Sequence, residues 1–327
     1  MKKLLLIIMA INFAACSDEN TEKNALVATA PKGETFNPDP TPADYLKANY
    51  PKYMETLDLV TKSQKANTAK TAAFVNTYVP DANFRSALIT AGAALDAVPG
   101  DNYIEINNAT AALNLANKGI ANFTGINSFT SLIQLSVAYN INPVTGTGLT
   151  ALDISGLTNL IILECQENKL TTLNLSTNTK LAQIWCHKNE LTSLTLPSST
   201  NLWGVWCYEN QLTTLNLNGN IGITDLFTQK NNLTSFNFAP FINLKKANVS
   251  NNKWVTVNFD ANGQLTALWC FSNTLLQHLY MRNAGADKIV TQDFRFNRSP
   301  NYIHVHSLWF PGAATRWPVK NGIFVEN

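Results

Sequence analysis

The sequence predicts a right-handed solenoid of parallel β-strands with an extended back wall, and two recurring positions predict it. Asparagine returns every 21 residues, and a large apolar residue, leucine in all coils but one, follows two places later. A coil of this length cannot bury its apolar side alone, whereas stacked coils share a continuous core. We expect about eight coils between a helical N-terminal cap and a C-terminal cap strand. The recurring asparagines are Asn168, Asn189, Asn210, Asn231, Asn252 and Asn273.

One repeat, residues 181–201, reads LAQIWCHKNELTSLTLPSSTN. In the strand segment of the next repeat, the alternation of side chains places Val205 and Cys207 on one face and Trp206 on the other. Residues 212–217 alternate again, which favours an extended back wall over a helix. The asparagine turns the chain inward, where its amide can bond to backbone groups that have no sheet partner.

The pattern L-x-x-L-x-C-x-x-N-x-L resembles the leucine-rich repeat. Its 21-residue form with cysteine in the strand resembles the bacterial subclass of internalin-type surface adhesins, over residues 105–285. The resemblance implies a leucine-rich repeat solenoid of the α/β type and favours a protein ligand. The sequence contains no nucleophile elbow, no phosphate loop and no acid pair with a positional argument behind it, so we expect no enzymatic activity. Four cysteines occupy inward positions, where we expect buried thiols with no catalytic or metal role: Cys165, Cys186, Cys207 and Cys270.

The N-terminus has the pattern of an export signal. Two lysines precede an apolar run, residues 4–11, that is too short to span a bilayer. The sequence Phe13-Ala14-Ala15-Cys16 resembles a bacterial lipobox, which implies a signal peptide over residues 1–15 and lipidation of Cys16. An ordinary secretory signal is the alternative. The acidic run that follows resembles the signal that sends lipoproteins to the outer face in one group of Gram-negative gut bacteria, so we expect a lipid anchor in the outer membrane, exposed at the cell surface.

The remaining segments divide by composition. We expect a lipidated flexible tether over residues 16–43 and a short helical segment over residues 44–72. An N-terminal cap follows over residues 73–104, with a helix after Pro80 that buries Phe84, Leu88 and Ile89. After the repeats, residues 286–327 form a C-terminal cap with a strand over 302–306 and a lid of bulky rings, Trp309, Phe310 and Trp317.

Aromatic residues gather at the outward strand positions. Alternation predicts that they form a stripe facing solvent, a pattern typical of interaction surfaces. Two alternatives remain open: the rings only stack to stabilise the strand ladder, or the N-terminal segment covers them. The residues of this candidate site are Trp185, Trp206, Phe227, Trp269, Tyr208, Phe271, His187 and Trp203, the last at the start of its strand.

We expect a non-enzymatic protein that binds a host or neighbouring-cell surface protein through this stripe. A glycan ligand and a passive spacer are the alternatives. A net charge of +2 gives no reason to propose a nucleic acid partner. His304 and His306 share a strand face, but no third metal ligand is evident, so we expect neither a metal nor a cofactor.

Overall fold

The computed structural model describes residues 42–49, 74–142, 145–217, 219–282, 291–293, 301–305 and 322–326. The chain divides into two compact units, Met1–Ser63 and Gln64–Asn327. In the first, the structure describes one helix, α2 (Pro42–Asn49), with Asp44 in its first turn and Lys47 in its last, as the helix dipole favours. The signal peptide, the tether from Cys16 up to residue 41 and the part of the predicted helical segment that follows residue 49 lie outside the described residues. No helix in the described ranges is long and apolar enough to cross a bilayer.

The second unit begins with the predicted N-terminal cap. Strands β1 (Phe74–Tyr78), β3 (Tyr103–Asn107) and β2 (Ala94–Leu95) form an antiparallel sheet beside helix α4 (Ala82–Thr90). Asp81 caps the helix by accepting a hydrogen bond from the Phe84 amide at 2.9 Å. Phe84 and Leu88 are buried as predicted, whereas Ile89 is 40% exposed. That part of the prediction is wrong, because Ile89 lies one residue further around the helix than Leu88.

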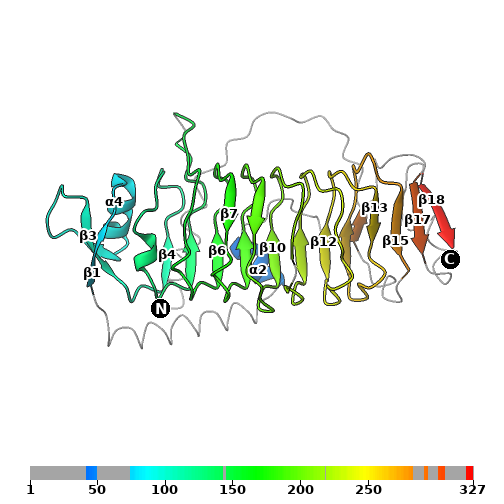
Figure 1. Cartoon of the computed structure of the whole chain (residues 1–327), viewed down its shortest axis with the longest axis horizontal. Coiled ribbons are helices and arrows are strands. Elements are labelled where there is room, and N and C mark those ends of the chain that lie inside the picture. The colour runs from blue at the N-terminus through cyan, green and yellow to red at the C-terminus, as the bar shows by residue number, and fades with distance from the viewer. Residues whose placement is uncertain are drawn as a thin grey trace. The chain divides into compact units, whose positions relative to one another are not determined.

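The repeats form one parallel sheet, in which each coil contributes a strand of three residues (Figure 1). The Cα register pairs equivalent positions of successive coils, such as Val205 with Ile184 on one side and with Leu226 on the other. The predicted solenoid of about eight coils is therefore confirmed. The strands are β4 (Ala112–Asn114), β5 (Gln134–Ser136), β6 (Ile162–Glu164), β8 (Gln183–Trp185), β10 (Gly204–Trp206), β11 (Asp225–Phe227), β12 (Lys246–Asn248), β14 (Ala267–Trp269) and β16 (Thr291–Asp293).

The back wall is extended, as predicted, with only a short 3-10 turn, η1 (Ile126–Ser128), on the way into the early coils. Strands β7 (Thr172–Asn174) and β9 (Ser193–Thr195) pair in parallel. After an irregular stretch in which Leu212 and Leu217 still reach the core, β13 (Thr256–Asn258), β15 (His278–Met281), β17 (Asn301–Val305) and β18 (Gly322–Glu326) form a second parallel sheet.

Strand β17 confirms the strand predicted over residues 302–306 as far as Val305, but it is not the last strand, because β18 follows it. His306 and the expected lid residues Trp309, Phe310 and Trp317 lie outside the described residues.

The core lies between the strand sheet and the back wall and includes the four inward cysteines, which are free thiols. Burial raises the pKa of the Cys207 and Cys270 thiols to about 12, so they remain protonated and unreactive. The expected ladder of buried thiols is confirmed.

The recurring asparagine joins each coil to the preceding one. The Asn210 amide donates to the Cys207 carbonyl at 3.0 Å and to the Cys186 carbonyl of the preceding coil at 3.1 Å. Its oxygen accepts from the Leu191 amide at 3.0 Å. Asn189 and Asn231 repeat the same three contacts. The predicted role of this position is therefore confirmed.

Candidate functional site: an aromatic row on the strand face

Four predicted rings hold the same register position on their strands. We call Trp185, Trp206, Phe227 and Trp269 the aromatic row; they end β8, β10, β11 and β14 respectively. None of the four belongs to the core cluster, although Ile184, Val205 and Leu226, one residue earlier, all do. The row therefore lies on the face of the sheet that points away from the core, as the alternation predicts.

The rings stack along the ladder. Trp185 and Trp206 lie 3.8 Å apart between ring centroids, with 3° between their planes. Phe227 stacks on Trp206 at 6.0 Å and 15°, and Trp269 reaches Phe227 at 6.1 Å past the intervening strand β12. Each such pair stabilises the fold by about 0.5–1.5 kcal/mol, in addition to the free energy gained by burying its apolar area. The prediction that these rings are neighbours along the sheet is confirmed.

The other predicted rings flank this row. His187 stacks on Tyr208 at 4.2 Å and 11°, two residues further along the same strands. Trp203 packs edge-on against Trp206 at 6.0 Å and 85°. Phe271 is half-buried and lies three coils beyond Tyr208, in the same coil as Trp269.

The expectation that these rings face solvent is wrong. Trp185 is 0% exposed and Trp206 1%, and even Trp269, the most accessible ring of the row, is only 9% exposed. His187 and Tyr208 are also buried. Part of the reason is the stacking, because each ring covers the face of its neighbour. These tryptophans also take part in further interactions. The row is thus outside the core and still closed to solvent.

Gly204 makes room for the Trp206 ring. A Cβ atom at position 204 would lie 2.4 Å from the far edge of that indole, so the ring extends back over the strand that carries it. One strand away, Trp185 extends in the same way, and its Nε1 donates to the Gln183 Oε1 atom at 3.4 Å. For Trp206, the glycine two residues earlier is the sequence signal of this close approach, and sequence reasoning missed it.

Carboxamides flank the rings, and some of their polar atoms lack partners. Both polar atoms of the Gln166 carboxamide are buried without a hydrogen-bond partner among the described residues. The same holds for the Gln183 nitrogen and the Gln229 oxygen. A buried polar group without a partner costs about 1–3 kcal/mol. These groups were not in the predicted site, although the same strand register reveals them.

Glu164 lies beside Trp185 in the strand register. The residue is half-buried, but its carboxyl group is desolvated, and this burial raises the pKa of Glu164 to about 7. A hydrogen bond with the Ser136 side chain opposes the rise. The carboxyl group therefore changes charge near neutral pH, next to the end of the aromatic row.

Two ion pairs lie beside the buried rings, between neighbouring coils. Lys188 reaches Glu167 at 3.0 Å, and Lys230 reaches Glu209 at 2.8 Å, each across adjacent coils. Partly exposed pairs of this kind contribute about 0–1 kcal/mol to stability. They reinforce the in-register stacking of coils and leave less free charge to attract a partner.

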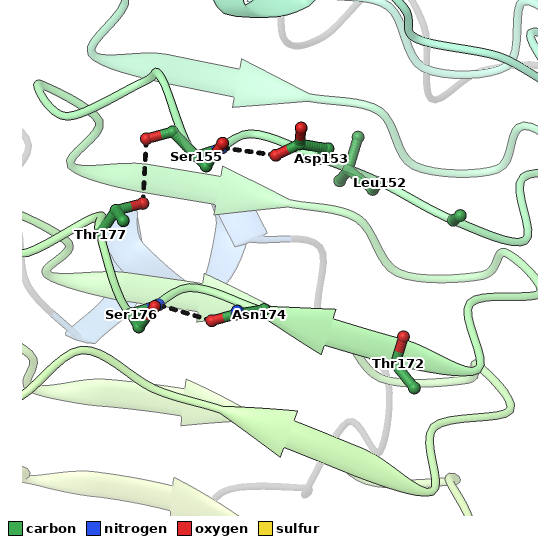
Figure 2. Close-up of a pocket in the computed structure, with 8 residues that line it drawn as sticks. Leu152, Asp153, Ser155, Thr172, Asn174, Ser176 and Thr177 are labelled. Atoms are coloured by element: carbon green, nitrogen blue, oxygen red, sulfur yellow. Dashed lines mark hydrogen bonds between the residues drawn. The ribbon is translucent and has the colours of Figure 1, made fainter.

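Outside the row, described residues line a polar hollow with a volume of about 310 Å³. Figure 2 shows its side chains. Its one carboxylate, Asp153, accepts a hydrogen bond from the Ser155 amide, and bonds from Ser155 lower the pKa of Asp153. Asn174 accepts from the Ser176 amide in the same way one coil later. These side chains stabilise the turns that carry them, so the hollow offers no pair of groups for acid–base chemistry.

In the described ranges, no three or more His, Cys, Asp or Glu residues come together as a metal site. His304 is paired with His278 of the neighbouring strand, at 3.1 Å between Nε2 and Nδ1. Sequence reasoning compared His304 only with His306 and missed this contact, because residue 278 is far from it in the chain.

Comparison with known proteins gives the fold. No protein-family model and no curated protein matches the sequence. Among solved structures, the leucine-rich repeat domain of APL1B superposes with a TM-score of 0.50 at 17% identity, over 68% of this chain and 74% of that one. The fold is a leucine-rich repeat solenoid.

Two proteins of Listeria monocytogenes also match. Internalin InlF matches with a TM-score of 0.42 at 17% identity, over 76% of this chain and 91% of that one. The functional domain of InlJ matches with a TM-score of 0.29 at 20% identity, over 70% and 75%.

The raised pKa of Glu164 predicts how stability depends on pH. The folded chain holds this proton up to about pH 7, whereas an unfolded glutamate releases it near pH 4.3. The folded state therefore binds more protons in this window, and stability falls as pH rises through it, by about 3–4 kcal/mol in total. Glu164→Gln should remove this fall and be the more stable protein above pH 7. Urea denaturation at several pH values measures the effect, and parallel profiles for the two proteins would contradict it.

Proposed function

We propose that this chain is a non-enzymatic binding protein, anchored to the outer membrane through an acylated Cys16, that holds a surface protein of a host or neighbouring cell on its aromatic row. The observation that carries the proposal is the continuous stack of rings on the face away from the core. The inward side chains of the coils, such as Ile184, Val205 and Leu226, already form the core. The outward tryptophans are thus additional apolar surface of the kind found at the centres of protein interfaces.

The geometry of the rings favours a protein ligand over a glycan. A sugar would stack on an open aromatic face, but the facing sides of Trp185 and Trp206 are occupied by each other at 3.8 Å. His187 and Tyr208 cover each other in the same way. Once the row is open, its stacked rings would present mainly their edges, which suit the side chains of a protein partner better than the flat face of a sugar ring.

Because the row is closed to solvent, binding requires it to open. The apparent affinity is then the intrinsic affinity multiplied by the fraction of molecules in which the row is open. Buried carboxamide atoms without partners, such as those of Gln166, make the closed state less stable than a fully bonded one. The free-energy difference between the closed and open states is therefore smaller, which supports an open state in which a partner contacts the rings.

The row is tested by a double substitution, Trp185→Ala/Trp206→Ala. Truncating central interface rings costs about 2–4 kcal/mol each, so we expect binding to weaken at least about 30-fold. A pull-down from host and bacterial surface proteins identifies the partner, whose affinity is then measured by biolayer interferometry, with a glycan array in parallel. Ile242→Ala is the matched control, because Ile242 is an apolar residue that is 61% exposed. Full retention of binding by the double variant would exclude the row as the site, and glycan-only binding would favour the alternative ligand.

The anchor is tested independently. Acyl chains on Cys16 would hold the mature protein at a membrane, because each buried CH₂ group contributes about 0.8 kcal/mol. Cys16→Ala should move the protein from the membrane fraction to the soluble fraction in its native host, as measured by fractionation and immunoblotting. Continued retention in the membrane fraction would count against lipidation.

A further inference from the structure

Four rings meet on the outer face of the C-terminal back-wall sheet. Leu279 and Met281 of β15 are buried, so His278 and Tyr280 point outward from this strand. On β17, Ile303 is buried and Tyr302 is exposed. The Cα register places His278 beside Tyr302 and Tyr280 beside His304. The two histidines are therefore diagonal neighbours on one face.

The histidines are joined through their ring nitrogens. The His278 Nδ1 and His304 Nε2 atoms are 3.1 Å apart, while the ring centroids are 5.4 Å apart. The centroid distance exceeds the nitrogen distance by about one ring width, so the two nitrogens face each other along the line that joins the rings. This is the geometry of an N–H···N hydrogen bond, in which one neutral imidazole donates and the other accepts. Lone pairs that bind one metal ion would instead converge on a third point.

Neighbouring rings fix this arrangement. Tyr280 stacks on His304 at 4.2 Å and 12°, and Tyr302 stacks on His278 at 5.4 Å and 16°. His304 is only 9% exposed. The imidazoles therefore have little freedom to turn away from each other when their protonation changes.

The charged groups nearby add to the cost of a positive charge on His304. Arg282 lies 5.1 Å above the Tyr280 ring and is bonded to Asp260 through Nε at 2.9 Å and Nη2 at 2.6 Å. Burial and the charges of His278 and Arg282 lower the pKa of His304, and Asp260 opposes them. On β13 the outward residues are Thr256 and Asn258, and the register partner of His304 on β18 is Val325, none of which titrates.

We propose that the His278–His304 pair is an acid-sensitive clasp that holds β17 to β15 near neutral pH and loosens the C-terminal coils when the pH falls. When both imidazoles are neutral, the N–H group of one ring donates a hydrogen bond to the bare nitrogen of the other. One added proton leaves the N–H···N bond in place, now charge-assisted. A second proton puts hydrogens on both facing nitrogens, so the bond is lost and two positive charges repel each other across it.

The direction of the pH effect follows from proton uptake. Below about pH 6.5 an unfolded histidine is protonated, whereas His304 in the folded chain resists protonation. The unfolded or frayed state thus binds more protons, and stability falls as the pH drops below that value. Because the pair joins only the last coils, the loss is local to the C-terminal end and spares the central strand ladder.

Hydrogen exchange of the full chain tests the clasp. Protection of peptides from β15 and β17, relative to peptides from β1 and β3 of the N-terminal cap in the same sample, should fall at least tenfold between pH 7 and pH 5 in the wild type. His304→Gln keeps a polar nitrogen in a similar place but does not titrate, so its relative protection should not change with pH. An equal fall in both proteins, or no fall in the wild type, would overturn the proposal.

A second measurement covers the case in which His304→Gln does not fold. His278→Asn retains a nitrogen near the position of Nδ1 and removes the partner charge. The NMR titration midpoint of His304 should then move up from its lowered wild-type value. A midpoint that is the same with and without His278 would show that the rings titrate independently and would also overturn the proposal.

Discussion

The buried amide of one asparagine in each coil is the interaction on which the rest of the structure depends. It bonds to carbonyl groups of its own coil and the preceding one and accepts from a backbone amide of that preceding coil. Asn189, Asn210 and Asn231 make these bonds in the same way. Without them, buried backbone groups in a turn with no sheet partners would remain unbonded, at about 1–3 kcal/mol each. The same bonds keep successive coils in phase, so residues 21 apart become neighbours.

This phase makes the aromatic row possible and explains why the sequence predicted it. Trp185 and Trp206 are 21 residues apart and meet face to face at 3.8 Å. The fold, the extended back wall, the inward thiols and the order of rings all follow from a repeat and a two-residue alternation, which are local features of the chain. A second set of buried asparagines, Asn178, Asn220 and Asn262, stabilises the opposite turn by bonds to carbonyls of the preceding coil. Sequence reasoning missed this second set because its asparagines recur only in every second coil.

Solvent exposure of the row could not be predicted in the same way. Alternation states which face of a strand a side chain points to, but burial depends on everything that packs on that face. Trp185 and Trp206 are therefore outward in direction and closed to solvent, two properties that the sequence pattern does not separate. The contact between His278 and His304 escaped for a related reason. Register partners on β15 and β17 are 24 residues apart and not 21, and the two histidines are diagonal neighbours, which makes them 26 apart.

The measurement that tests this account most directly compares Asn210→Ala with Gln211→Ala, a substitution at an adjacent exposed position. Asn210→Ala leaves the Leu191 amide and the carbonyls of Cys186 and Cys207 without their side-chain partner, so it should lower the free energy of unfolding by about 2–4 kcal/mol. It should also change the near-ultraviolet circular dichroism of the stacked tryptophans, while Gln211→Ala leaves both quantities close to wild type. Equal stability and equal spectra for the two variants would show that the asparagine does not set the phase of the coils.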